Sequence, residues 1–474
     1  MSFIASRLPR CFWLASGSRR VVMHASLITL AAAANGGCVH YVPLPLPDMP
    51  DLHASLPMRD AASFRGGLPA LPSHASDARR PLTMMDVAIF AVIENPQLKA
   101  QRLKRGLGDA QVFSAGLLPD PQLALSLAPV LSGPGTVTGW SYGFNYDLQS
   151  LVLRRAKVAV AEATADKIDL ETLWQEWQVV QQARTLFVTL AFGERKLDLL
   201  RAREKLAQER FDKSNKALSA RSVTIETAGP DLTTLLDVKS QVAQLERARE
   251  DARLGLNALL GLQPDVSVPI TRLEPPKPVS RATVEREMDS VANRRPDLLA
   301  LRAGYEAQEG QLQQAILAQF PSVVVGLAHA NDTSGVQTIN LGVTLGLPLF
   351  NGNKGEIAIQ ATTREQLRQE YQARIDQTVN DIQLLARRQD LFERQISALA
   401  HEEPILFDMA KQAEAAYAKG DINALVFLNL ETSLLQKRME LLDLEEALWA
   451  ARIALETLLG WPERAVAAED GEHL

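Results

Sequence analysis

The chain repeats its own pattern after about 200 residues, and this repeat constrains the fold more than any other feature of the sequence. An Asn/Arg-Pro-x-Leu sequence opens each copy at Pro96 and Pro296, and a Leu-Leu-Gly sequence closes each copy at Gly261 and Gly460. Solenoid repeats are much shorter, with periods of roughly 20 to 50 residues. The long period therefore predicts a duplicated module of domain size. Each copy has the same predicted order of helix, two short strands, a very long helix and a second helix.

The repeat and the distribution of proline divide the chain into segments. We expect a signal peptide at 1–37, a lipidated proline-rich tether at 38–80, a first repeat at 81–261, a surface linker at 262–285, a second repeat at 286–460 and a flexible acidic tail at 461–474.

The N-terminus is typical of an exported protein. A basic stretch with Arg19 and Arg20 precedes a short apolar run at residues 27–34, and small residues then lead to Cys38. This order resembles a bacterial lipoprotein signal, so we expect lipidation of Cys38 with fatty acyl chains such as palmitate. Asn35 stands where such signals usually carry an aliphatic residue, and the alternative is cleavage by ordinary signal peptidase, which leaves Cys38 as an incidental thiol. No cysteine follows Cys38, so neither a disulfide framework nor a cysteine-based metal site is expected.

The composition narrows the classes of function. Charged residues make up 22% of the chain and the formal net charge is −6, whereas a nucleic-acid-binding domain usually has a basic footprint. We therefore expect no nucleic-acid partner. The sequence contains no run of about 18 apolar residues, so it predicts no transmembrane helix.

Four short segments, two in each copy, alternate between apolar residues and small or polar residues. Such period-two alternation is typical of β-strands with one apolar face, and the segments are close to the roughly 9–11 residues that cross a bilayer as a tilted strand. We expect a lipid-facing belt made of Trp140, Tyr142, Phe144 and Tyr146 in the first copy and Ile339, Leu341, Val343 and Leu345 in the second. The alternative is that the apolar face lies in a soluble core, but two hairpins make a poor core for so large a chain.

The small number of strands has a consequence for assembly. Four strands cannot close a barrel, and an open sheet edge in lipid leaves backbone groups without hydrogen bonds. If these strands span a membrane, several chains must contribute to one barrel. Because the smallest barrels have about eight strands, a dimer or a trimer would suffice, and the strand count alone does not choose between them.

Helical sequence fills most of the remaining chain. Residues 154–218 and 354–417 each predict a helix of some 60 residues, on the order of 90 Å long, and Pro404 should bend the second one. Apolar residues in these segments are separated by alternating steps of three and four, which is typical of coiled coils. Return helices are expected at 232–260 and 424–459, so the first return helix should be several residues shorter than the second.

This order of elements resembles that of the TolC-type outer-membrane efflux proteins over residues 82–460. The resemblance rests on the duplicated Pro-x-Leu openings, the paired strands, the Leu-Pro-Leu-Phe-Asn-Gly sequence that ends at Gly352 and the Tyr-x-x-Gly turn that ends at Gly420. It implies an α+β membrane protein that is mostly long coiled-coil helices forming an α-barrel, with four transmembrane β-strands per chain in a shared trimeric β-barrel. The implied activity is a passive exit duct for small molecules or metal ions. It implies a homotrimer in the outer membrane of a Gram-negative bacterium that contacts membrane lipid, a periplasmic adaptor protein and an inner-membrane pump.

The resemblance also implies a gate at the periplasmic ends of the helices. Tyr417 matches the gate tyrosine of the family in position, Asp237 matches an aspartate on the facing return helix, and Gly420 lies in the turn. Ile422 stands where the family carries an arginine. The alternative is that Tyr417 is an aromatic residue at the rim and Asp237 a helix-start aspartate.

The sequence lacks the motifs of an enzyme. It has no nucleophile elbow or phosphate-binding loop, and its seven histidines are scattered without the spacing of metal ligands. We expect neither catalytic residues nor a cofactor, and a pore lined by polar residues would instead set selectivity. The main alternative function is a periplasmic or surface-anchored coiled-coil scaffold in which the strands form a small head.

Overall fold

The computed structural model describes residues 40–57, 80–273, 276 and 279–460. The signal peptide, Cys38, most of the tether and the acidic tail that the sequence predicts lie outside these residues. The chain divides into two units, Met1–Asp51 and Leu52–Leu474. In the first unit, the described residues 40–51 form neither helix nor strand, and their side chains are exposed.

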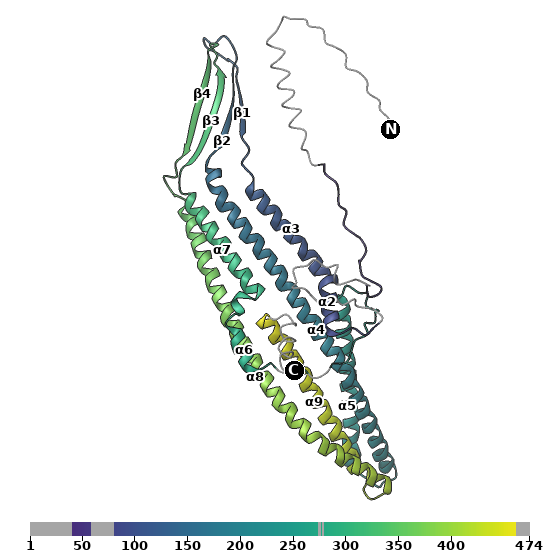
Figure 1. Cartoon of the computed structure of the whole chain (residues 1–474). Helices are drawn as coiled ribbons and strands as arrows, with labels where there is room; N and C mark the ends of the chain where they lie inside the picture. The colour runs from purple at the N-terminus through teal and green to yellow at the C-terminus, as the bar shows by residue number, and fades with distance from the viewer. Residues whose placement is uncertain (1–39, 58–79, 274–275, 277–278, 461–474) are drawn as a thin grey trace, which may run out of the picture. The chain divides into compact units, whose positions relative to one another are not determined.

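The second unit is mostly helical, with one small sheet at an end of the long helices (Figure 1). The order of helix, hairpin, long helix and return helix occurs twice in it, as α3-β1-β2-α4-α5 and as α7-β3-β4-α8-α9. The elements are α2 (Met84–Glu94), α3 (Pro96–Gly116), β1 (Gln122–Ala128), β2 (Gly139–Asp147), α4 (Gln149–Ser219), α5 (Ile225–Leu259), α6 (Arg281–Met288), the 3₁₀ turn Val291–Asn293, α7 (Pro296–Leu317), β3 (Ser322–Asn331), β4 (Gln337–Gly346), α8 (Lys354–Lys419) and α9 (Ala424–Leu459).

Asn95 separates α2 from α3 and ties both to the end of α5. Proline fixes its own φ and excludes the helical conformation from the residue before it, so Pro96 ends α2 and starts α3. The Asn95 side chain accepts a hydrogen bond from the backbone of Leu98 at 2.9 Å, which caps α3. Its amide nitrogen donates to the carbonyl of Leu259 at 3.1 Å. A short polar segment therefore anchors three helix ends.

The sheet is antiparallel with strand order β1-β2-β3-β4. Each predicted strand pair is present, and β2 and β3 join the two hairpins through a register in which Tyr142 lies opposite His329. The helices beneath the sheet follow the same order, because α3 packs on α4, α4 on α7, and α7 on α8. Below them α4 packs on α5 and α9, and α8 packs on α9.

The two long helices are longer than the sequence predicts, with 71 residues in α4 and 66 in α8. The return helices are almost equal, with 35 residues in α5 and 36 in α9. The prediction of a shorter first return helix was therefore wrong. The helix α5 begins at Ile225, before the predicted start at residue 232, and includes Pro230 near its start, where fewer helical hydrogen bonds are lost than in a helix interior. Pro404 likewise lies inside a continuous α8.

A core near the middle of the helices includes the segment between the two halves of the chain. Phe187 and Phe192 of α4 pack there with Leu260 and Leu262. Leu262 is buried, and the buried Gln389 side chain of α8 donates to the carbonyl of Val279 at 2.9 Å. The sequence predicted a surface linker here, but its described ends are packed against the helices. Among the described residues, no helix is long and apolar enough to span a membrane.

Candidate functional site

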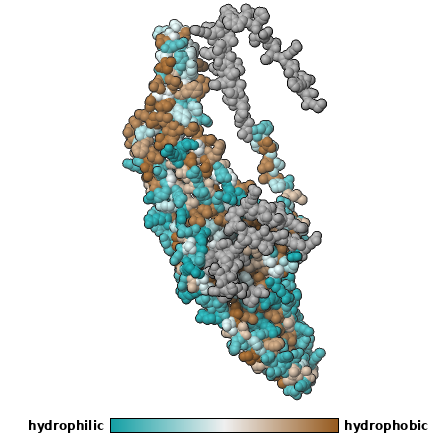
Figure 2. Space-filling model, in the orientation of Figure 1, coloured by the Kyte–Doolittle hydropathy of each residue, from teal (hydrophilic) through white to brown (hydrophobic). Residues whose placement is uncertain are grey.

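The sheet has one continuous apolar face. The register places Leu123, Phe144, Leu327 and Leu341 in one row across all four strands. All of them are exposed, and Leu341 is 80% exposed. Figure 2 shows apolar surface gathered at the end of the second unit that carries the sheet, with more polar surface toward the opposite end. Isolated exposed leucines are common, but a patch that covers a whole sheet face marks a surface with a partner.

The belt residues that the sequence predicts all lie on this face. Trp140 and Tyr142 stack with ring centroids 5.7 Å apart, and the His329 ring lies within 5.5 Å of both. The aromatic cluster is at the end of the sheet far from the helices. The other predicted residues of the belt continue the face along β2 and β4, namely Phe144, Tyr146, Ile339, Leu341, Val343 and Leu345.

The opposite face of the sheet carries small side chains. Its rows contain Ala124, Gly143, Ala328 and Asn340 in register. A Cβ atom at Gly143 would lie 2.7 Å from the Cβ of Ala328, so this position accepts only glycine without a shift of its neighbour. Both faces thus follow the period-two pattern, one apolar and one small or polar.

The outer strands β1 and β4 each have one edge without a strand partner among the described residues. An unpaired edge presents a row of free backbone N–H and C=O groups, which favours pairing with another strand. An apolar face and two open edges in one sheet indicate that the chain is one part of a larger assembly.

At the far end of the helices, Tyr417 of α8 contacts α4 and α9. The Lys213 ammonium donates to the Tyr417 hydroxyl at 3.1 Å and lies 5.1 Å from the centre of its ring. The ring of Phe427 in α9 stacks on the Tyr417 ring, with centroids 5.3 Å apart. Charge, hydrogen bond and stacking therefore hold the end of α8 against the two neighbouring helices.

A second polar cluster lies close to the same tips. Arg210 of α4 donates to the buried carboxylate of Asp231 in α5 at 2.6 Å and to the side-chain oxygen of Asn429 in α9 at 2.7 Å. This fork joins three helices. Because Asp231 is buried, loss of the arginine would leave an uncompensated charge.

The comparisons with known proteins agree with this geometry. Residues 288–461 match the family model described as outer membrane efflux protein. Over these residues the chain is similar to the outer membrane efflux proteins. The TolC-type resemblance seen in the sequence is thus confirmed. No curated protein matches the sequence closely enough to add to this assignment.

Crystal structures of several outer-membrane proteins share the fold of this chain. CusC matches with a TM-score of 0.62 and 19% sequence identity, covering 88% of this chain and 99% of that chain. VceC of Vibrio cholerae matches with a TM-score of 0.64 and 17% identity, covering 80% and 96% of the two chains. The open state of MtrE from Neisseria gonorrhoeae matches with a TM-score of 0.62 and 16% identity, covering 80% and 88%. At these identities the likeness concerns the fold.

The structure separates the gate residues that the sequence predicts. Gly420 has a φ of +82°, a conformation that favours glycine, and ends α8 in the tip turn. Tyr417 contacts Lys213, whereas Asp237 is exposed on α5 and takes part in neither polar cluster. Sequence reasoning missed Lys213 and Arg210. Neither lies in the last turn of α4, whose basic residue is Lys216, so the sequence gives no signal that distinguishes them from the other cations of this helix.

Charged pairs also join α4 to α9 near the middle of the molecule. Arg184 and Glu456, both largely buried, lie 2.7 Å apart. Burial lowers the pKa of Lys196, but its hydrogen bonds to Asp443 and Glu446 outweigh burial, so the pKa is raised. Within the described part of the chain, no group of three or more histidine, cysteine, aspartate or glutamate side chains could hold a metal ion.

Proposed function

We propose that the chain is the exit duct of a tripartite efflux system in the outer membrane of a Gram-negative bacterium. In this proposal a homotrimer pools its strands into one closed β-barrel and its helices into an α-barrel across the periplasm. Small molecules or metal ions pass through it without catalysis, and an adaptor protein and an inner-membrane pump supply them. The observation that carries the proposal is the sheet, with one exposed apolar face, one face of small residues and two open edges.

Membrane physics connects these features. Backbone groups in lipid must be hydrogen-bonded, so the edges of β1 and β4 require strands of other copies. The apolar face then contacts lipid, and the small face lines the lumen, as in other barrels of this kind. A soluble scaffold would instead expose the row that contains Leu341 to water. The TolC-type resemblance implies a trimer rather than the dimer that the strand count also allows.

We also infer that the two halves of the chain are copies of one module. The first helix of each half begins at a proline that directly follows a polar residue. Both halves then continue through the same order of elements. The bounds of the signal peptide, the tether and the acidic tail stay predictions from the sequence. A lipid on Cys38 would anchor the N-terminus to the membrane, and labelling with a palmitate analogue, absent from a Cys38→Ser variant, tests this.

The helix tips are the proposed gate. Tyr417 and its partner Lys213 connect α8 with α4, and Gly420 provides the tight turn next to them. Asp237 projects from the exposed face of α5, where in a trimer it could meet a neighbouring copy. The gate opens when these contacts between helices are released.

Three measurements test the proposed function. The full-length protein in planar lipid bilayers should give discrete single-channel steps, and cell fractionation should recover it from the outer membrane. A strain that lacks the protein should accumulate the cargo of its pump, and the wild-type gene should restore export. Recovery of a folded, non-conducting monomer from the soluble periplasm would support the scaffold instead.

A further inference from the structure

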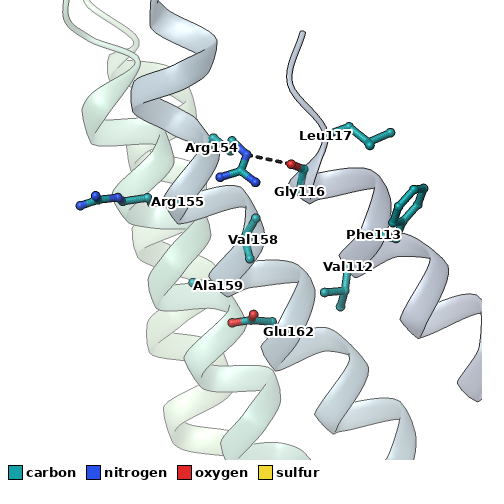
Figure 3. A pocket seen from close by; sticks show the side chains of 9 residues that line it. All are labelled: Val112, Phe113, Gly116, Leu117, Arg154, Arg155, Val158, Ala159 and Glu162. Carbon is teal, nitrogen blue, oxygen red and sulfur yellow. Dashed lines mark hydrogen bonds between the residues drawn. The ribbon is translucent and has the colours of Figure 1, made fainter.

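A groove of about 430 Å³ lies between the end of α3 and the start of α4, close to the sheet. Its α3 wall contains Phe113, Gly116 and Leu117. Figure 3 shows Arg154 of α4 reaching across the groove to α3, where its Nε donates to the carbonyl of Gly116 at 2.8 Å. The volume falls within the range of about 300–1,000 Å³ that is typical of ligand sites.

The α4 wall of the groove carries two exposed side chains of opposite charge, Arg155 and Glu162. They are seven residues apart, or two turns of helix, so they lie on one face of α4 about 10 Å apart along its axis. Neither side chain forms an ion pair or a hydrogen bond with another residue in the described part of the chain. The groove therefore offers one cation and one anion whose hydrogen-bonding capacity is unused.

The second half of the chain keeps the bond between the helices but not this pair of charges. With β2 and β4 aligned at their central glycines, Asn353 is the equivalent of Arg154. Its amide nitrogen donates to the carbonyl of Ala315 at 2.8 Å, so α8 is tied to α7 as α4 is tied to α3. Ala361 stands in the place of Glu162. Packing of the helices thus does not require the charged pair, which points to a ligand of the first half.

The groove begins at the level where lipid headgroups lie in the proposed outer-membrane location. The nine residues of β2, at about 3.4 Å each and tilted by about 40°, cover roughly 23 Å of a hydrocarbon core about 30 Å thick. Exposed apolar residues at the adjoining helix ends extend this apolar surface, namely Leu117, Leu118, Leu151 and Val152. Arg154 and Arg155 follow about 7–9 Å along α4 from its start. Arginine side chains at such a boundary reach the phosphate groups of the interface.

We infer that this groove binds the headgroup of a phospholipid that carries both a phosphate and a primary ammonium group, in the periplasmic leaflet. The inference rests on the proposed function, because it needs the sheet to lie in the outer membrane. In such a lipid the phosphate is nearer to the acyl chains and the ammonium group is farther from them. The groove has the matching order, since Arg155 lies nearer to the sheet and Glu162 lies farther from it.

The side chains of the groove also distinguish this headgroup from others. The guanidinium of Arg155 can donate two parallel hydrogen bonds to a phosphate, and the carboxylate of Glu162 accepts from the ammonium group. A headgroup that ends in glycerol has no cation for Glu162, and one that ends in trimethylammonium has no N–H to donate. Figure 3 shows Val112 and Val158 pointing toward the gap between the two helices, where they provide an apolar floor for the carbon atoms of the headgroup.

Lipid binding to the purified full-length protein tests the inference. Native mass spectrometry in detergent measures the affinity for phosphatidylethanolamine and for phosphatidylglycerol with the same acyl chains. The wild-type protein should prefer the ethanolamine lipid by about fivefold or more. Glu162→Gln should abolish this preference, and Arg155→Gln should weaken the binding of both lipids by about fivefold. Lys354→Gln is the matched control and should change neither affinity, since Lys354 is the exposed equivalent of Arg155 in the second half, where the carboxylate is absent.

The outcomes separate the inference from the proposed function. A preference for the ethanolamine lipid that Glu162→Gln abolishes and Lys354→Gln retains supports the inference. A wild-type protein that conducts in planar bilayers but binds both lipids equally overturns the inference and leaves the proposed function standing. This comparison uses the wild-type protein alone, so it decides even where a variant does not fold. A protein that is recovered from the soluble periplasm and binds neither lipid overturns both.

Discussion

The helices α3 and α7 have nearly the same length and the same start, yet α3 buries three residues and α7 buries nine. The difference does not come from helix propensity, since both sequences form continuous helices. It comes from position, because α7 lies between two helices and α3 lies at an edge. The buried face of α7 therefore shows how a helix at this place packs when it has a neighbour on both sides. In the sheet, the edge strands β1 and β4 differ from the central strands β2 and β3 in the same way, because each has a strand partner on one side only among the described residues.

Identical substitutions at equivalent positions of the two helices should give the largest contrast. Ala307→Glu places a carboxylate in the packed contact with α4, which costs several kcal/mol, so little folded protein should accumulate. Leu107→Glu adds the same charge to an exposed face, so each chain should fold while assembly fails. Immunoblots of membranes and size-exclusion chromatography in detergent measure the two effects.

Leu107→Ala controls for the loss of the leucine side chain and should still assemble, because alanine occupies the equivalent place in α7. An equal loss of folded protein in the two glutamate variants would remove the difference between the helices.

Substitutions on the two faces of β4 should differ strongly as well. Leu341→Arg places a charge on the exposed apolar face, which near the bilayer midplane costs about 2–4 kcal/mol in each chain. Asn340→Arg places the same side chain on the face of small residues, where lumen water can solvate it. Outer-membrane fractionation should show loss of Leu341→Arg and retention of Asn340→Arg. Equal insertion of both variants would contradict the assignment of the faces.

The tips connect the two halves through Lys213 and Tyr417, so their release should change conductance more than stability. Tyr417→Phe removes the acceptor of the Lys213 hydrogen bond, and combination with Asp237→Ala removes the exposed carboxylate. We expect this double variant to raise single-channel conductance severalfold in planar bilayers. Tyr305→Phe, which breaks a hydrogen bond to Glu309 far from the tips, is the control and should leave conductance unchanged. Unchanged conductance in the double variant would refute the gate.

The smallest effect concerns the junction of α4 with α9. Burial raises the pKa of Glu445, and its contacts with Arg195 lower it only in part. Because the folded-state pKa of Glu445 is raised, its contribution to the free energy of unfolding is fully present below the unfolded-state pKa. This contribution is lost as the pH rises through the folded-state pKa of Glu445. Glu445→Gln should therefore raise the melting temperature slightly at pH 7.5 and not at pH 4. The same shift at both values would assign the effect to packing rather than to charge.

The sequence predicted features that local chemistry determines. Pro96 and Pro296 placed helix starts, and alternation along residues 140–148 and 339–347 placed strands and their apolar faces, because a strand exposes successive side chains on opposite sides. The start of α5 was predicted too late in the chain, and the helix includes Pro230 because a proline is tolerated near a helix start. The partners of Arg210 and Lys213 were not predictable, because each lies on another helix and only the packing of α4 against α5, α8 and α9 selects it.

Electron cryo-microscopy of the full-length protein in lipid nanodiscs tests the central claim most directly, because it shows which chain completes each edge. We predict a closed homotrimer in which β1 of one copy is hydrogen-bonded to β4 of the next. Monomers with both sheet edges free, or copies joined through other surfaces, would contradict the account.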